Sequence, residues 1–158
     1  HSGTVRPVYG HGLVFAATGL ARGEMWAIRP DGSGVVTDSH VAWKVTKNAP
    51  NRPSPVLAGE LLFMLNQDGG VVTCLEAKTG TLVWSERLPG LGNYSASPVF
   101  ADGRLYFCNE NGQTTVIAAG REFQVLAENV LGDGFMASPA IAGKALYLRS
   151  KSALYRIE

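Results

Sequence analysis

The sequence predicts an all-β fold, namely a β-propeller built from four-stranded antiparallel blades. Three observations support this prediction: a repeat of about 40 to 50 residues, 19 glycines among 158 residues, and short apolar runs without the period of helices. Glycine at this frequency indicates many turns, and four short strands per repeat is the composition of a propeller blade. We therefore expect about four blades, the last of them incomplete.

Each repeat starts at a proline, and these prolines lie 48, 43 and 41 residues apart. An aromatic residue follows eight positions after each proline, an aliphatic residue precedes that aromatic, and a glycine precedes the pair. The prolines are Pro7, Pro55, Pro98 and Pro139, and the aromatic residues are Phe15, Phe63, Tyr106 and Tyr147. Each repeat is therefore predicted to begin with a strand, a tight glycine turn and a second strand.

The second strands are apolar on both alternating faces, so both faces need cover, as in radially stacked blades. They are predicted at residues 13–17, 61–65, 105–108 and 145–148. Turn-forming residues at 66–70 and 109–112 precede predicted third strands at 71–75 and 114–118, and fourth strands are expected to end at Trp43 and Trp84. The last repeat supplies a third strand and no fourth. We predict one partial propeller over residues 1–158, with approximate blades at 5–47, 53–91, 95–132 and 136–158.

Composition and charge exclude some classes of partner. The 14 basic residues nearly cancel the 13 acidic ones, and they form no basic stripe, so a nucleic-acid partner is not expected. No apolar run reaches the length of a transmembrane segment, and His1-Ser2-Gly3-Thr4 is neither a signal peptide nor a lipid anchor. Cys74 and Cys108 lie in apolar runs and are expected to be buried free thiols, with a disulfide left open as the alternative.

The segment from Cys74 to Trp84 contains Thr79-Gly80, followed by a tryptophan four residues after the glycine. It resembles the signature of pyrroloquinoline-quinone-like (PQQ-like) propeller repeats. Residues 27–34, 93–98 and 154–158 also resemble the carboxy-terminal half of bacterial proteins of this family. The resemblance implies about eight blades in a complete propeller, of which this chain would supply roughly half, and a periplasmic or secreted location.

In these repeats the tryptophan is expected to dock against the next blade, and Thr79-Gly80 to form the hairpin before it. The third repeat lacks a tryptophan, so Phe123 or Leu126 is expected to fill the docking space. The first repeat also departs from the pattern, because a longer connection starting at residues 31–34 leads to Trp43.

Quinone-dependent dehydrogenases share this architecture, but they need Ca²⁺ ligands, a carboxylate base and, in many, adjacent cysteines. Five aspartates lie in turn-forming contexts, and the histidines lack metal-site spacing and are expected to face solvent. Three serines precede prolines, where their hydroxyls are expected to bond neighbouring backbone groups. These residues are Asp31, Asp38, Asp68, Asp102 and Asp133; His1, His11 and His40; and Ser54, Ser97 and Ser138. We therefore predict no catalytic, cofactor-binding or metal-binding residue in this chain.

The predicted function is that of a non-catalytic binding or scaffold module. Candidate partner-facing residues lie in the loops entering each innermost strand, which gather on one face of a propeller: Arg52, Asn93, Tyr94, Phe135 and Met136. Self-association through open blade faces is the other expected mode of contact. Two alternatives stay open: a fragment of a PQQ-dependent dehydrogenase whose catalytic residues lie outside this chain, and a remnant without activity of its own.

Overall fold

The computed structural model describes residues 4–18 and 23–158. Within these residues the chain forms fifteen β-strands and one short helix, and the strands make four antiparallel sheets. Blade 1 contains β1 (Val8–Gly10), β2 (Leu13–Thr18), β3 (Glu24–Ile28) and β4 (Val41–Val45), and blade 2 contains β5 (Val56–Ala58), β6 (Leu61–Asn66), β7 (Val71–Glu76) and β8 (Leu82–Arg87). Blade 3 contains β9 (Val99–Ala101), β10 (Arg104–Cys108), β11 (Gln113–Ala118) and β12 (Val125–Val130), and blade 4 contains β13 (Ala140–Ala142), β14 (Ala145–Arg149) and β15 (Leu154–Ile157).

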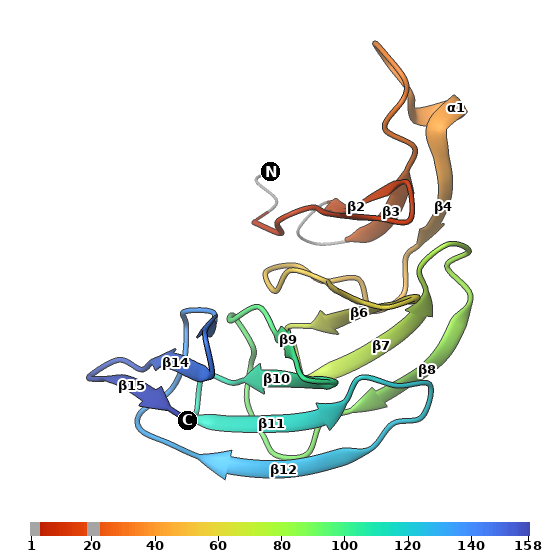
Figure 1. Cartoon of the computed structure of the whole chain (residues 1–158). Coiled ribbons are helices and arrows are strands. Elements are labelled where there is room, and N and C mark those ends of the chain that lie inside the picture. The colour runs from red at the N-terminus through yellow and green to blue at the C-terminus, as the bar shows by residue number, and fades with distance from the viewer. Residues whose placement is uncertain (1–3, 19–22) are drawn as a thin grey trace.

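The four sheets lie side by side in an open arc (Figure 1), and each follows the strand order of the chain. The first strands are innermost, because β5 lies against both β1 and β9. This arrangement confirms the prediction of an all-β propeller with antiparallel blades, and the fourth sheet has three strands within the described residues.

Strand β6 shows why the blades stack. Leu61–Leu65 are all buried, and alternate side chains pack against different neighbouring blades. Phe63 packs with the core of blade 3, whereas Met64 packs with that of blade 1. Because successive strand residues point to opposite faces, an uninterrupted apolar run is stable only with a sheet on each side.

The first hairpin of each blade turns within two residues. In blade 1, Gly10 pairs with Leu13, and His11 and Gly12 have φ values of 54° and 74°. Positive φ at both positions is the type I′ turn, whose twist matches the flanking strands. The glycine turns predicted between the first and second strands are thereby confirmed.

The tryptophans join each blade to the next. Trp43 Nε1 donates a hydrogen bond to the carbonyl of Ala77 in blade 2 at 3.0 Å, and Trp84 Nε1 donates to the carbonyl of Gly120 in blade 3 at 3.1 Å. The docking prediction is confirmed. Both residues lie inside β4 and β8, however, and the prediction that they end their strands is wrong.

Blade 3 does not dock in the predicted way. Phe123 lies 5.3 Å from the ring of Trp84, so it packs against blade 2, and Leu126 is 44% exposed. Ala127 pairs with Val116 as Trp84 pairs with Cys74, and therefore occupies the tryptophan position. Neither Phe123 nor Leu126 fills the docking space, and that prediction is corrected.

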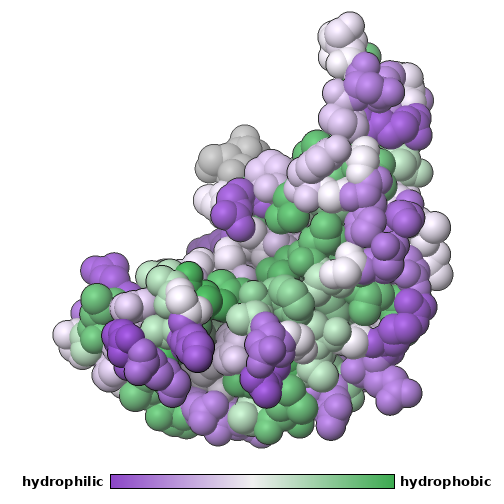
Figure 2. Space-filling view, viewed as in Figure 1, coloured by the Kyte–Doolittle hydropathy of each residue, from purple (hydrophilic) through white to green (hydrophobic). Residues whose placement is uncertain are grey.

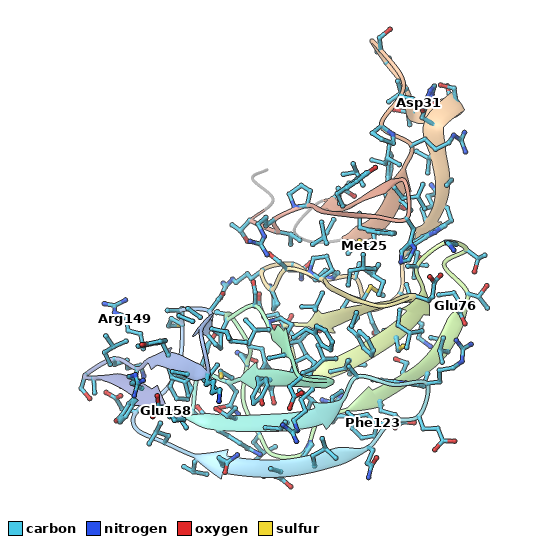
Figure 3. All side chains as sticks on the ribbon, in the orientation of Figure 1. Met25, Asp31, Glu76, Phe123, Arg149 and Glu158 are labelled. Carbon is cyan, nitrogen blue, oxygen red and sulfur yellow. The ribbon has the colours of Figure 1, made fainter. Side chains whose placement is uncertain are left out.

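The long connection in blade 1 contains helix α1 (Thr37–His40), which the sequence did not predict. Four residues are too few to show a helical period. The connection projects from the arc, and Figure 3 labels Asp31 in it, at the opposite end from Glu158. Figure 2 shows that this projection is mainly hydrophilic, whereas hydrophobic residues gather over the sheets that follow.

Candidate functional site

A row of serine hydroxyls links the innermost strands. The backbone N–H of Arg6 donates to Ser54 Oγ, that of Ser54 donates to Ser97 Oγ, and that of Ser97 donates to Ser138 Oγ, each at 2.9 Å. The serines were predicted to bond neighbouring backbone groups. They do bond backbone groups, but each group belongs to the preceding blade, so the predicted local partner is wrong. The hydrogen bonds that these hydroxyl oxygens accept therefore join neighbouring blades at the inner wall.

If this chain held a quinone cofactor with Ca²⁺, residues of the inner wall would have to supply the ligands. A hollow of about 400 Å³ there is lined by Arg6, Ser54, Ser97, Pro98, Val99, Ser138 and Pro139. Calcium requires several oxygen ligands, usually including carboxylates. This lining contains none and its serine hydroxyls already accept backbone hydrogen bonds, so the residues of this wall do not fit that group.

The two cysteine thiols are buried and free, as predicted. Burial raises the pKa of Cys74 to about 12, and burial raises the pKa of Cys108 to about 11. Because the thiolate is the reactive form, both side chains behave as small apolar core residues.

His11 contradicts the expectation of a solvent-facing histidine. Its side chain is 18% exposed, its Nε2 lies 2.8 Å from the carbonyl of Gly59, and its Nδ1 lies 3.7 Å from Glu60. The residue therefore links the first hairpins of blades 1 and 2. His40 is 25% exposed and lies 3.5 Å from Asp31, whereas His1 lies outside the described residues.

The aspartates follow their prediction as turn residues with one exception. Asp31, Asp68, Asp102 and Asp133 lie in turns, and Asp38 lies in the first turn of α1. The pKa of Asp133 is lowered, chiefly because the Ser150 hydroxyl donates a hydrogen bond to its carboxylate. Within the described residues, no three His, Cys, Asp or Glu side chains form a group that could hold a metal ion.

The loops that enter the inner strands lie on one face with the turns between second and third strands. We call this surface the entry-loop face. It comprises residues 46–55, 88–98 and 131–139 with the turns 66–70 and 109–112. Arg52 donates to Ser95 Oγ at 3.2 Å, Ser95 donates to Glu110 at 2.5 Å, and Asn111 donates to the carbonyl of Leu91 at 3.0 Å.

Backbone hydrogen bonds fix the same loops. The N–H of Tyr94 donates to the carbonyl of Gln67 at 3.1 Å, and that of Phe135 donates to the carbonyl of Asn109 at 3.0 Å. The loops 88–98 and 131–139 are thus each bonded to the turn of the preceding blade. Such bonds limit the conformations of the face and lower the ordering cost of binding.

The predicted partner-facing residues divide into two groups. Arg52, Asn93 and Met136 are exposed on this face. Tyr94 and Phe135 are only 3% and 1% exposed, because their rings fill spaces between blades. These two are corrected to core residues, while a role for the first three in binding stays a prediction.

Sequence reasoning missed other members of the face. Leu91 is 88% exposed, and Ser95 and Glu110 complete the bonded row that starts at Arg52. The loop sequence Pro89-Gly90-Leu91-Gly92 could have drawn attention to Leu91, since an apolar residue between glycines has few neighbours to bury it.

Residues 7–158 match the family model described as outer membrane protein assembly factor BamB. No curated relative matches the sequence. Within the described residues, no helix is long and apolar enough to cross a membrane.

Solved structures share the fold at low identity. BamB from Moraxella catarrhalis is 15% identical with a TM-score of 0.69, over 95% of this chain and 44% of that chain. The quinohemoprotein alcohol dehydrogenase ADHIIG from Pseudomonas putida HK5 is 13% identical with a TM-score of 0.70, over 90% of this chain and 27% of that chain. The computationally designed protein Ika8 is 11% identical with a TM-score of 0.64, over 96% of this chain and 45% of that chain. This chain therefore spans less than half the length of each.

Proposed function

Because the chain belongs to the PQQ-like repeat family described as outer membrane protein assembly factor BamB, we propose that it is part of a non-catalytic β-propeller that binds a protein partner. The binding surface is the entry-loop face. The name of this family refers to the assembly of outer-membrane proteins, and a docking role for this chain is consistent with that name.

One observation carries the proposal, namely the combination of fixed loops with exposed apolar side chains. Leu91 is 88% and Met136 is 56% exposed, and both extend from loops that bond across blades. Arg52 and Asn93 supply exposed polar neighbours. Apolar anchors with a polar surround on a preorganised surface are typical of protein-binding sites.

The state of five nucleophilic side chains, three serines and two cysteines, supports a non-catalytic role. The hydroxyls of Ser54, Ser97 and Ser138 accept interblade hydrogen bonds, and burial suppresses ionisation of both cysteine thiols. The alternative function is that of a PQQ-dependent dehydrogenase segment whose catalytic residues lie outside this chain. The related fold of the quinohemoprotein dehydrogenase favours it.

Self-association is a second candidate. The sequence led us to expect contact through open blade faces, whereas the exposed edge strand β15 favours contact at a sheet edge. Within the described residues β15 pairs only with β14, and Leu154 and Ile157 are 70% and 42% exposed. A sheet edge with unpaired backbone groups and apolar side chains readily accepts another strand. We propose that a second copy of the chain pairs at this edge, which sedimentation at increasing concentration would reveal as a dimer.

The proposed location is the periplasm or the extracellular space, by relation to the family. A fusion to a reporter enzyme that folds only after export tests this location. Reporter activity supports it, and activity confined to the cytoplasm contradicts it.

Site-directed crosslinking tests the proposed binding face. A photoactivatable residue would replace Leu91 or Met136, and in the control it would replace Lys144, an exposed residue of a first hairpin on the opposite face. We expect a discrete crosslinked protein from positions 91 and 136 in cell-envelope extracts and none from position 144. The same adducts from all three positions, or none from any, would contradict the proposal.

A further inference from the structure

The three loops of the entry-loop face differ at one repeated position. This position lies three residues before the serine that precedes each repeat proline, and it is occupied by Asn51, Tyr94 and Phe135. Tyr94 and Phe135 are buried, whereas Asn51 remains partly exposed. The interface between blades 1 and 2 therefore lacks the aromatic ring that closes the next two interfaces.

The next interface shows what that ring does. The ring of Tyr94 lies so close to Gly70 that a Cβ there would come within 2.6 Å of its Cε2 atom. Gly70 immediately precedes β7 in blade 2. Asn109 directly follows β10 in blade 3 and starts the turn after that strand. Tyr94 thus occupies the space between Gly70 of blade 2 and Asn109 of blade 3.

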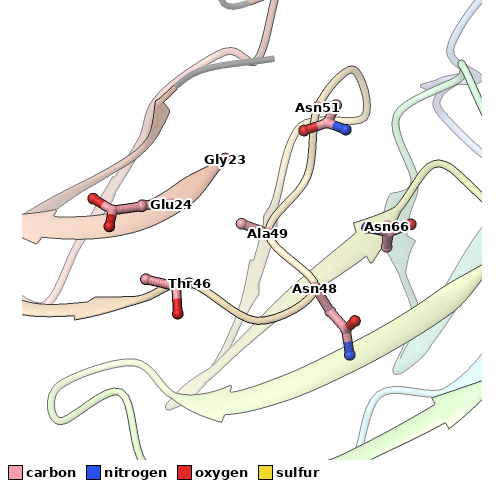
Figure 4. A pocket seen from close by; sticks show the side chains of 7 residues that line it. All are labelled: Gly23, Glu24, Thr46, Asn48, Ala49, Asn51 and Asn66. Atoms are coloured by element: carbon pink, nitrogen blue, oxygen red, sulfur yellow. The ribbon is translucent and has the colours of Figure 1, made fainter. Parts of the chain in front are cut away.

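The described residues leave the corresponding space between blades 1 and 2 unfilled. Gly23 precedes β3 as Gly70 precedes β7, and Asn66 ends β6 and starts its turn as Asn109 does in the next blade. These two residues line a hollow of about 430 Å³, together with Ala49 and four polar residues. The four are Glu24, Thr46, Asn48 and Asn51 (Figure 4). A hollow of this size is in the range of small-molecule sites.

The lining carries polar groups that are not fully used. Within the described residues, the side chains of Thr46 and Asn51 make no hydrogen bond, Asn66 uses only its Oδ1, and Asn48 uses only its Nδ2. Amides and hydroxyls both donate and accept, so these groups together match a ligand that also does both. An apolar ligand would leave them without partners.

Among the lining residues that the structure describes, Glu24 carries the only charge, and this charge is balanced. Glu24 accepts a hydrogen bond from Trp26 Nε1 at 2.7 Å, and its other carboxylate oxygen lies 3.9 Å from Lys44 Nζ. The remaining lining residues are neutral. This balance favours a neutral ligand over an anion or a cation.

We propose that the hollow between blades 1 and 2 is a binding site for a neutral sugar ring. A pyranose has the size of the missing aromatic ring, carries no charge, and presents hydroxyls that donate to and accept from the amides of Asn48, Asn51 and Asn66. The hollow opens on the entry-loop face, but its lining does not include Leu91 or Met136. Sugar binding and protein binding are therefore measured at different residues, so either proposal can fail alone.

Nuclear magnetic resonance titration of the chain tests the proposal. The probes are glucose, galactose and N-acetylglucosamine, with glucuronate as the charged comparison and p-cresol as the aromatic one. Asn51→Tyr restores the residue type of the next interface and should close the hollow. Lys144→Tyr is the control, because Lys144 is exposed in a first hairpin on the opposite face.

We expect at least one neutral sugar to shift the amide signals of residues 46–51 and 66 saturably. Affinity should fall at least tenfold in Asn51→Tyr and stay within twofold in Lys144→Tyr. It should fall severalfold in Thr46→Val, which removes one hydroxyl without changing the shape. Unchanged melting temperatures would show that the variants fold. The proposal is overturned if no neutral sugar binds, if p-cresol or glucuronate binds in preference, or if Asn51→Tyr retains the affinity.

Discussion

The serine row at the inner wall yields a quantitative prediction for Ser97→Ala. The Oγ of Ser97 accepts the N–H of Ser54 at 2.9 Å, and Ser54 is 6% exposed. Removing the hydroxyl leaves a buried backbone donor without a partner, which costs about 1–3 kcal/mol. Ser138→Ala removes an equivalent bond to the N–H of Ser97, but this bond is exposed, so water replaces it and the cost should stay below about 1 kcal/mol.

Urea unfolding of the two variants measures this difference, and Ser97→Thr serves as the control because it keeps the hydroxyl. Hydrogen exchange of the Ser54 amide supplies the local readout: exchange should accelerate in Ser97→Ala and stay near the wild-type rate in Ser138→Ala. Equal losses of stability in the two alanine variants, or an unchanged Ser54 exchange rate in Ser97→Ala, would refute the assignment of the bond.

Three further predictions concern the core. Trp84→Phe should lower the free energy of unfolding by about 1 kcal/mol, because it loses the hydrogen bond to Gly120 but keeps a ring near Phe63 and Phe123. Trp84→Ala should lower it by about 3–5 kcal/mol. Equal effects of the two variants in urea unfolding would count against blade docking. Folding raises the pKa of Cys74 from 9.0 to about 12, so stability should decline as pH rises from about 9 toward 12, and Cys74→Ala should flatten that decline in thermal melts. A thiol reagent at pH 8 should label neither cysteine until urea unfolds the chain, and rapid labelling without urea would contradict their burial.

The repeat made the fold predictable because propeller blades reuse one pattern of residues. Apolar runs such as Leu61–Leu65 identify strands that are covered on both sides, and the glycines mark the hairpins between them. The details that failed depend on neighbouring blades. The sequence of blade 3 shows that a tryptophan is missing, but only the strand register shows that Ala127 stands in its place.

The candidate site was less predictable for the same reason. Loop position alone placed Tyr94 and Phe135 with Arg52, Asn93 and Met136, but the first two point into interblade spaces and the others do not. Burial of a loop residue depends on the size of the gap beneath it, which no local pattern encodes. Comparing the same position across blades, as at Asn51, recovers part of that information.

Calorimetric titration of the protein at its natural full length with PQQ and Ca²⁺ tests the non-catalytic role most directly. The residues of the inner wall do not supply the carboxylate oxygens that such a site needs. We predict no saturable heat of binding. Saturable binding of the quinone that depends on Ca²⁺ would contradict the proposed role and identify the chain as part of a quinoprotein dehydrogenase.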